Sequence, residues 1–256
     1  MKHAKDSKIS MNIIPKSLIK VVASASLLAT TLIASSHSLA SQPLPFEAVY
    51  QANYSGLKVT AKRSLKKLPN GNHELRFSAK SWIASIEEFS QFQWNDSGQL
   101  VPQLYEYHRT GLGKDRHAVL TFDWQEGKVT NNVQQKPWSM DVPQATLDKL
   151  SYQLQLRNDL LNASPDLQYQ VADGGRLKDY SFELMGEEVL QTPIGKVNTV
   201  KIKRIRAADK KRITYLWLAQ DWNYLVVRLR QQEKDGKHYE INLARAELDG
   251  QSLQGN

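Results

Sequence analysis

The sequence contains no cysteine among its 256 residues. That absence excludes disulfide bonds, thiolate metal sites, thiol nucleophiles and a lipid-modified cysteine within this chain. The sequence also lacks a Gly-x-Ser-x-Gly elbow and a strictly spaced pair of histidine metal ligands, and its longest apolar run is too short to span a bilayer. We therefore expect no catalytic residues, no metal site and no cofactor.

The first forty residues have the pattern of an export signal. Basic residues precede the apolar run Val21–Ala34, and Ser38-Leu39-Ala40 then supplies the small residues that signal peptidase requires. Polar, proline-containing sequence follows, which argues against a membrane anchor. The pattern predicts a cleaved signal peptide over residues 1–40, a periplasmic location, and a mature protein of residues 41–256.

The charge of the chain gives little reason to expect a nucleic-acid partner. The whole sequence carries a formal net charge of +8, with 34 basic and 26 acidic residues. Residues 1–40 hold five lysines and one aspartate, so 29 basic and 25 acidic residues remain after cleavage, for a net charge of +4. Such a balance is weak evidence for binding nucleic acid. The remaining length suits one β-rich domain with a single core.

The mature sequence reads as short strands separated by turn signals. Leu68-Pro69-Asn70-Gly71, Asn95-Asp96-Ser97-Gly98 and Asp173-Gly174-Gly175 each interrupt segments in which apolar and polar residues alternate. Tyr180, Phe182 and Leu184 show the period of two that is typical of a half-buried strand. Regular spacing of this kind predicts an antiparallel meander. Most of the six tryptophans are expected in its core, with Trp138, in the irregular run before the helix, as the best candidate for exposure.

One segment, Thr146–Leu161, predicts a helix with Thr146 as its N-cap. At about 100° per residue, a stripe of four leucines lies nearly opposite a second apolar stripe, formed by Tyr152, Leu156 and Leu160. A helix that is apolar on two sides needs two surfaces to cover it. We expect one stripe to anchor the helix on the concave side of a bent sheet. The Tyr152 stripe is expected to line a cavity or meet a covering flap.

A basic segment supplies a second candidate binding feature. On a strand, Lys201 and Lys203 share the face opposite Val200 and Ile202, where they could meet phosphate or carboxylate groups of an envelope polymer or lipid. The alternative is a solvated strand whose lysines protect a sheet edge, which is the commoner arrangement. The candidate ligand-binding residues are therefore Tyr152, Leu156, Leu160, Lys201 and Lys203.

Several short motifs together resemble an exported bacterial family, domain of unknown function 3108. The motifs are Leu44-Pro45-Phe46-Glu47-Ala48-Val49-Tyr50 with Gly56, Phe122-Asp123-Trp124, Asp148-Lys149-Leu150-Ser151, Thr192-Pro193-Ile194-Gly195 and Trp217-Leu218-Ala219-Gln220-Asp221. The resemblance covers essentially the whole mature chain. It implies an exported β-rich domain and carries over no activity or catalytic residue.

The expected fold is mainly β, a strongly curved antiparallel meander or incomplete barrel with one helix, about residues 146–161, on its concave side. We expect a non-enzymatic periplasmic protein of the cell envelope that binds an apolar or lipid-like ligand, or a hydrophobic segment of a partner. Its partner would be a lipid or an anionic envelope component. The alternatives are an outer-membrane β-barrel protein and an envelope hydrolase, although no catalytic constellation can be assembled for the latter.

Overall fold

The structure is a computed structural model, and it describes residues 41–54, 57–111, 113–206 and 212–256. The predicted signal peptide lies outside the described residues. The described strands are β1 (Phe46–Tyr54), β2 (Leu57–Lys67), β3 (His73–Lys80), β4 (Ala84–Trp94), β5 (Leu100–Gly111), β6 (Arg116–Asp123), β7 (Lys128–Val133), β8 (Lys136–Asp141), β9 (Gln168–Ala172), β10 (Leu177–Thr192), β11 (Gly195–Ile205), β12 (Ile213–Ala219), β13 (Leu225–Gln232), β14 (His238–Leu248) and β15 (Gln251–Ser252). The described helices are α1 (Ser151–Leu161) and a 3₁₀ turn, η1 (Gln220–Trp222).

The strands form one antiparallel sheet, in which most neighbours in space are also neighbours in sequence. Strands β1 to β8 make one meander and β9 to β14 another, and the pairing of β1 with β14 joins the two. The predicted turns connect successive strands; Leu68–Gly71, for example, links β2 to β3 and is closed by a hydrogen bond from the Gly71 N–H to the Leu68 carbonyl. Among the described strands, no ladder pairs β8 with β9, so the sheet is not closed into a barrel. The predicted meander is confirmed.

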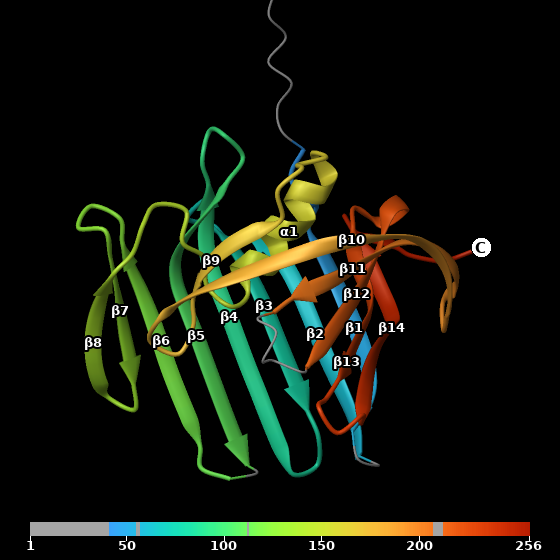
Figure 1. Ribbon diagram of the computed structural model, residues 1–256, viewed down its shortest axis with the longest axis horizontal. Coiled ribbons are helices and arrows are strands. Elements are labelled where there is room, and N and C mark those ends of the chain that lie inside the picture. Colours follow the sequence, from blue (N-terminus) through green and yellow to red (C-terminus); the bar gives the residue numbers. More distant parts are fainter. Residues whose placement is uncertain (1–40, 55–56, 112, 207–211) are drawn as a thin grey trace, which may run out of the picture. The chain divides into compact units, whose positions relative to one another are not determined.

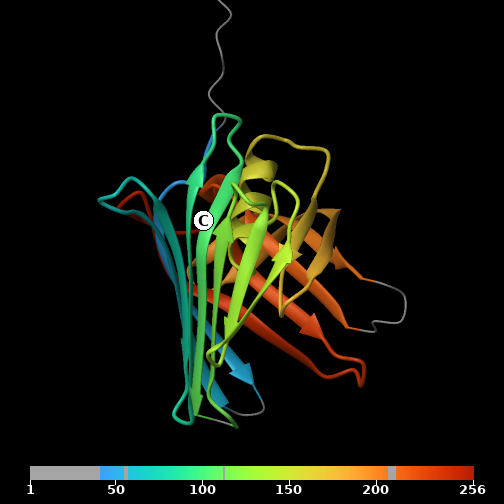
Figure 2. The ribbon, with the colours of Figure 1, turned by 90° about the vertical axis from the view of Figure 1, so that its left-hand side faces the viewer.

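The sheet bends around α1. In Figure 1, β9 and β10 pass in front of β3–β5, and α1 lies between these layers. Figure 2 shows the same arrangement from the side, with the green strands forming one wall, the orange and red strands the other, and α1 near one end of the space between them. The concave face carries the core, whose fully buried members include Leu75, Phe92, Ile202, Leu218 and Leu243.

The helix begins later than the sequence predicts, because Asp148 rather than Thr146 caps it. The Asp148 carboxylate accepts hydrogen bonds from the backbone N–H groups of Leu150 and Ser151, each at 2.8 Å. The Ser151 hydroxyl in turn accepts a bond from the Asp148 N–H at 2.7 Å, which completes a reciprocal cap. The hydroxyl of Thr146 instead donates to the Pro143 carbonyl. Leu147 is held outside the helix by a parallel bridge to Val171 of β9.

Both apolar sides of α1 are covered, as its pattern predicts. Leu154 is 1% exposed and Leu156 is 2% exposed, although they lie about 200° apart around the helix. Leu160 is buried as well, so this second stripe packs into the core except at Tyr152, which is only partly buried. Within the described part of the chain, no helix has the length and apolar character needed to cross a membrane.

Two details of the strands differ from the alternation in the sequence. Leu184 is 55% exposed instead of continuing the buried row of Tyr180 and Phe182, although it keeps the register of Phe182 and pairs with the buried Ile202; the ladder shifts register only after it. Trp138 lies on β8 instead of in an irregular run, and its predicted exposure is confirmed at 41%. Trp82, at 83%, is exposed further still.

A side-chain contact joins the two ends of the open sheet. Gly175, in the turn between β9 and β10, lies against the indole of Trp138 on β8, where a Cβ atom would overlap the ring. Its backbone also adopts a positive φ of 81°, a conformation that glycine accepts without strain. Glycine at this position therefore lets β8 approach the β9–β10 turn without a hydrogen-bonded ladder.

We expect Asp148→Asn to be at least as stable as the wild type at neutral pH. Asparagine keeps the oxygen that caps α1, while burial raises the pKa of the Asp148 carboxyl and so disfavours its charge. Because the folded pKa is raised, protonation of Asp148 contributes stability that is fully present below the ordinary pKa of 3.8 and is lost as pH rises through the folded pKa. The advantage of asparagine should therefore disappear on acidification, as urea unfolding at several pH values would show.

Asp148→Ala is the matched control. It leaves two backbone N–H groups and the Ser90 hydroxyl, which donates to Asp148 at 2.6 Å, without their acceptor. The free energy of unfolding should fall by about 2 kcal/mol or more. Equal destabilisation by asparagine and alanine would show that the charge, and not the capping oxygen, stabilises the helix.

Gly175→Ala should loosen β8, whereas Gly174→Ala should not. Both glycines have positive φ, so both substitutions strain the backbone, but only a Cβ at Gly175 meets the Trp138 ring. We expect Gly175→Ala to cost about 1 kcal/mol more than Gly174→Ala. Hydrogen exchange should accelerate in β8 for Gly175→Ala alone. Identical exchange in the two variants would mean that the Trp138 contact does not hold the ends of the sheet together.

Candidate functional site

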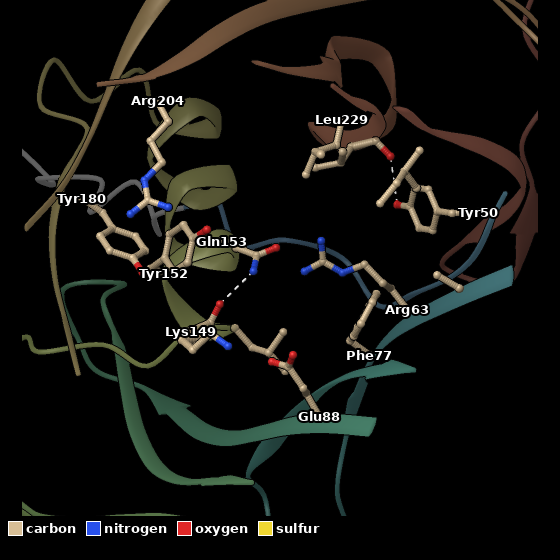
Figure 3. A pocket seen from close by; sticks show the side chains of 14 residues that line it. Tyr50, Arg63, Phe77, Glu88, Lys149, Tyr152, Gln153, Tyr180, Arg204 and Leu229 are labelled. Atoms are coloured by element: carbon tan, nitrogen blue, oxygen red, sulfur yellow. Dashed lines mark hydrogen bonds between the residues drawn. The ribbon is translucent and has the colours of Figure 1, made fainter. Parts of the chain in front are cut away.

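A partly enclosed cavity of about 280 Å³ lies on the concave side of the sheet, beside the first turn of α1. Figure 3 shows it from close by, with side chains entering from β1, β2 and β4, from α1 and the turn before it, and from β10 and β11. The lining residues are Tyr50, Ala61, Arg63, Phe77, Glu88, Lys149, Leu150, Tyr152, Gln153, Tyr180, Arg204, Val226, Leu229 and Ile241. The volume is just below the range of about 300–1,000 Å³ that is usual for small-molecule sites.

One part of the wall is apolar. Four strands, β2, β3, β13 and β14, supply its side chains, which are those of Ala61, Phe77, Val226, Leu229 and Ile241. The Tyr50 ring adds to this surface, because its hydroxyl is turned away to donate a hydrogen bond of 2.9 Å to the Val226 carbonyl. This surface suits a hydrocarbon group.

Two arginines occupy inward positions of their strands. Arg63 lies between the buried residues Ala61 and Leu65 in the inward row of β2. Arg204 continues the row that Val200 and Ile202 begin on β11. Since side chains of a strand alternate between its faces, both guanidinium groups enter the concave side. Figure 3 shows them approaching the cavity from different walls.

The positive charge of the lining exceeds its negative charge. Arg63, Lys149 and Arg204 are the cations, and Glu88 is the only carboxylate among the described lining residues. Glu88 already accepts a hydrogen bond of 3.0 Å from the Tyr105 hydroxyl. The described lining contains no serine, histidine or cysteine that could form a nucleophile–base pair. The described lining therefore combines an apolar surface with an excess of positive charge.

Aromatic rings surround the Arg204 end of the cavity. The Arg204 guanidinium carbon lies 3.5 Å from the centre of the Tyr180 ring, which contacts Tyr152 edge to face at 4.9 Å between centroids. Burial raises the pKa of the Tyr152 phenol to about 12, while Arg204, Arg63 and Arg206 act in the opposite direction. Tyr152 therefore stays neutral at physiological pH.

The residues predicted from the sequence are not brought together in one place. Tyr152 lines the cavity, whereas Leu156 and Leu160 are buried in the core and do not line it. Lys201 and Lys203 alternate with Ile202 and Arg204 and so lie on the other face of β11. The Lys201 ammonium is 3.4 Å from the Glu188 carboxylate and lies over the Trp217 ring.

Two histidines near the Gly111 turn, His108 and His117, take a structural place. His108 and His117 face each other across the β5–β6 ladder, with ring centroids 5.5 Å apart, and His117 contacts the Glu106 carboxylate at 2.9 Å. In the described part of the chain, no group of three histidine, cysteine, aspartate or glutamate residues is placed to hold a metal ion.

Comparisons with known proteins give a family and a fold. The family described as "Protein of unknown function (DUF3108)" matches residues 49–243 of this chain. No curated protein matches the sequence. The structure is similar to that of a beta-barrel-like protein of domain of unknown function DUF1849 from Brucella abortus, with a TM-score of 0.54 and 10% identity over 81% of this chain and 99% of that one. At that identity, the likeness shows the fold.

Two further crystal structures are similar at lower TM-scores. One is MucB in complex with MucA(peri), with a TM-score of 0.33 and 10% identity over 83% of this chain, which spans about half (52%) of that chain. The other is a putative lipoprotein from Parabacteroides distasonis, with a TM-score of 0.28 and 12% identity over 80% of this chain and 96% of that one. Similarity at this level supports no functional argument.

Proposed function

The chain belongs to the DUF3108 family of proteins of unknown function, and we propose that it is a non-enzymatic periplasmic protein that binds an apolar or lipid-like ligand. The observation that carries this proposal is the cavity beside α1, with its wall of Ala61, Phe77, Val226, Leu229 and Ile241. A concave, largely apolar site with a few polar groups is the usual form of a small-molecule site.

The described lining also favours binding over catalysis. Several polar groups of the lining already form hydrogen bonds within the chain. Tyr50 donates to the Val226 carbonyl, Gln153 donates to the Lys149 carbonyl, and Glu88 accepts from Tyr105. Those contacts hold the walls in place. A hydrophobic segment of a partner protein is the second candidate occupant, and it would use the same apolar wall.

The periplasmic location is proposed from the leader. The apolar run and Ser38-Leu39-Ala40 support export with cleavage after Ala40. Protein recovered from the periplasm of a Gram-negative host should therefore begin at Ser41, which N-terminal sequencing would show. A recovered chain that begins at Met1 or Met11 would remove both the signal peptide and the proposed location.

Filling the cavity should weaken binding of an apolar probe. Ala61→Leu adds carbon atoms to the lining, so affinity for the neutral fluorophore N-phenyl-1-naphthylamine should fall about tenfold or more, equivalent to about 1.4 kcal/mol. Thr60→Leu is the matched control, since Thr60 is the exposed neighbour on the other face of β2. Fluorescence titration of the three proteins measures the effect. Equal binding by all three would place the probe elsewhere, and no binding by the wild type would remove the proposed function.

Native mass spectrometry of protein purified from its own periplasm would identify the occupant. A retained small molecule supports a lipid-like ligand, and a retained peptide supports the partner segment. An empty protein that also fails to bind the neutral probe would contradict both.

A further inference from the structure

We propose that the cavity selects an anionic amphiphile, whose carboxylate or phosphate head is attracted by Arg63 and Arg204, which enter from different walls, while its hydrocarbon chain lies on the apolar wall. The inference rests on the proposed function and deepens it by naming the chemical class of the ligand. Its starting point is the Nε atoms of Arg63 and Arg204, which are buried and have no hydrogen-bond partner among the described residues.

A buried donor without a partner is rare in native proteins and calls for an acceptor that the chain itself does not supply. Neither Arg63 nor Arg204 forms an ion pair with a carboxylate in the described part of the chain. The guanidinium group cannot relieve this by losing its proton, because it stays charged in proteins. An anion in the cavity would be attracted by the positive charges of both arginines.

Another buried arginine shows what a structural guanidinium looks like in this fold. Arg157 donates from Nε and Nη2 to the Asn223 carbonyl, at 3.3 and 3.0 Å, and lies 4.6 Å from the centre of the Phe46 ring. Its contacts tie α1 to the turn between β12 and β13. Arg63 has no comparable partner, and Arg204 interacts with Tyr180 while its Nε has no hydrogen-bond partner among the described residues.

The chemistry of the surroundings favours an amphiphile over a simple anion. The guanidinium fork matches the paired oxygens of a carboxylate or phosphate. Next to it lie Phe77, Leu229 and Ile241, which would gain nothing from a small hydrated ion. Lys149 adds a third positive charge to the lining, and Tyr152 supplies a neutral hydroxyl near the same arginines. One molecule with a charged head and an apolar chain would engage both surfaces.

Isothermal titration with four dodecyl compounds below their micelle concentrations would test the proposal. Dodecanoate and dodecyl phosphate share the chain of dodecanol but carry the anionic head, and dodecyltrimethylammonium carries a cation. The wild-type protein should bind the two anions at least about tenfold more tightly than dodecanol, since hydrogen bonds to charged groups are the strong ones. It should bind the cation most weakly. The ratio between dodecanoate and dodecyl phosphate distinguishes a carboxylate from a phosphate head.

Substitutions would test whether the anionic head group interacts with the two arginines. Arg63→Gln and Arg204→Gln should each reduce affinity for the anions about tenfold and leave affinity for dodecanol unchanged. Arg63→Lys and Arg204→Lys keep the charge and should lose less. Lys203→Gln removes a cation from the opposite face of β11 and should change neither affinity. Circular dichroism melts would confirm that each variant folds.

The outcomes separate this inference from the proposed function. If dodecanol binds as tightly as the anions and the glutamine variants change neither affinity, the cavity is an apolar site. The head-group assignment is then wrong, while the proposed function stands. If Lys203→Gln weakens the anions as much as Arg204→Gln does, the effect is general electrostatics and the assignment also falls. If none of the four compounds binds, both the assignment and the proposed lipid-like ligand fall.

Discussion

Burial of α1 on two opposite sides is the constraint on which the rest of the structure depends. Leu154 and Leu156 point in nearly opposite directions, and both are almost fully buried. A flat sheet could cover only one of them. The sheet therefore has to bend so that β9 and β10 cover one side of the helix while the β1–β6 strands cover the other, and that bend creates the concave face on which the cavity lies.

Polar side chains of the same helix fix its position within the bend. The Gln155 side chain accepts from the Leu100 N–H, Asn158 donates to the Gly98 carbonyl, and Arg157 donates to the Asn223 carbonyl. These backbone groups lie at the ends of strands, where a sheet leaves them without ladder partners. Buried polar residues on α1 thus form hydrogen bonds with these backbone groups, and they align Tyr152 and Gln153 with the cavity.

The meander could be predicted from the sequence because its information is local. A turn such as Leu68–Gly71 and an alternating segment such as β3 contain their own signals. The start of α1 could not be predicted from the sequence, since Thr146 and Asp148 are both acceptable N-cap residues. The choice between them depends on the bridge from Leu147 to Val171, a contact that only the folded chain makes. The exposure of Leu184 could not be predicted either, since the alternation along one strand does not show which side chains other elements cover.

The site could be predicted only in part, for a related reason. Alternation along β11 correctly separates Lys201 and Lys203 from Ile202, but the same alternation places Arg204 on the inward face, and that was the more informative residue. Arg63 carries the same signal between Ala61 and Leu65. An arginine in an apolar row can be a structural tie, as Arg157 is, and only the folded arrangement of acceptors distinguishes the two cases. Arg157 has its acceptor in the chain, whereas Arg63 and Arg204 have no carboxylate partner among the described residues and line a cavity that also has an apolar wall, and that difference favours a ligand over a structural role.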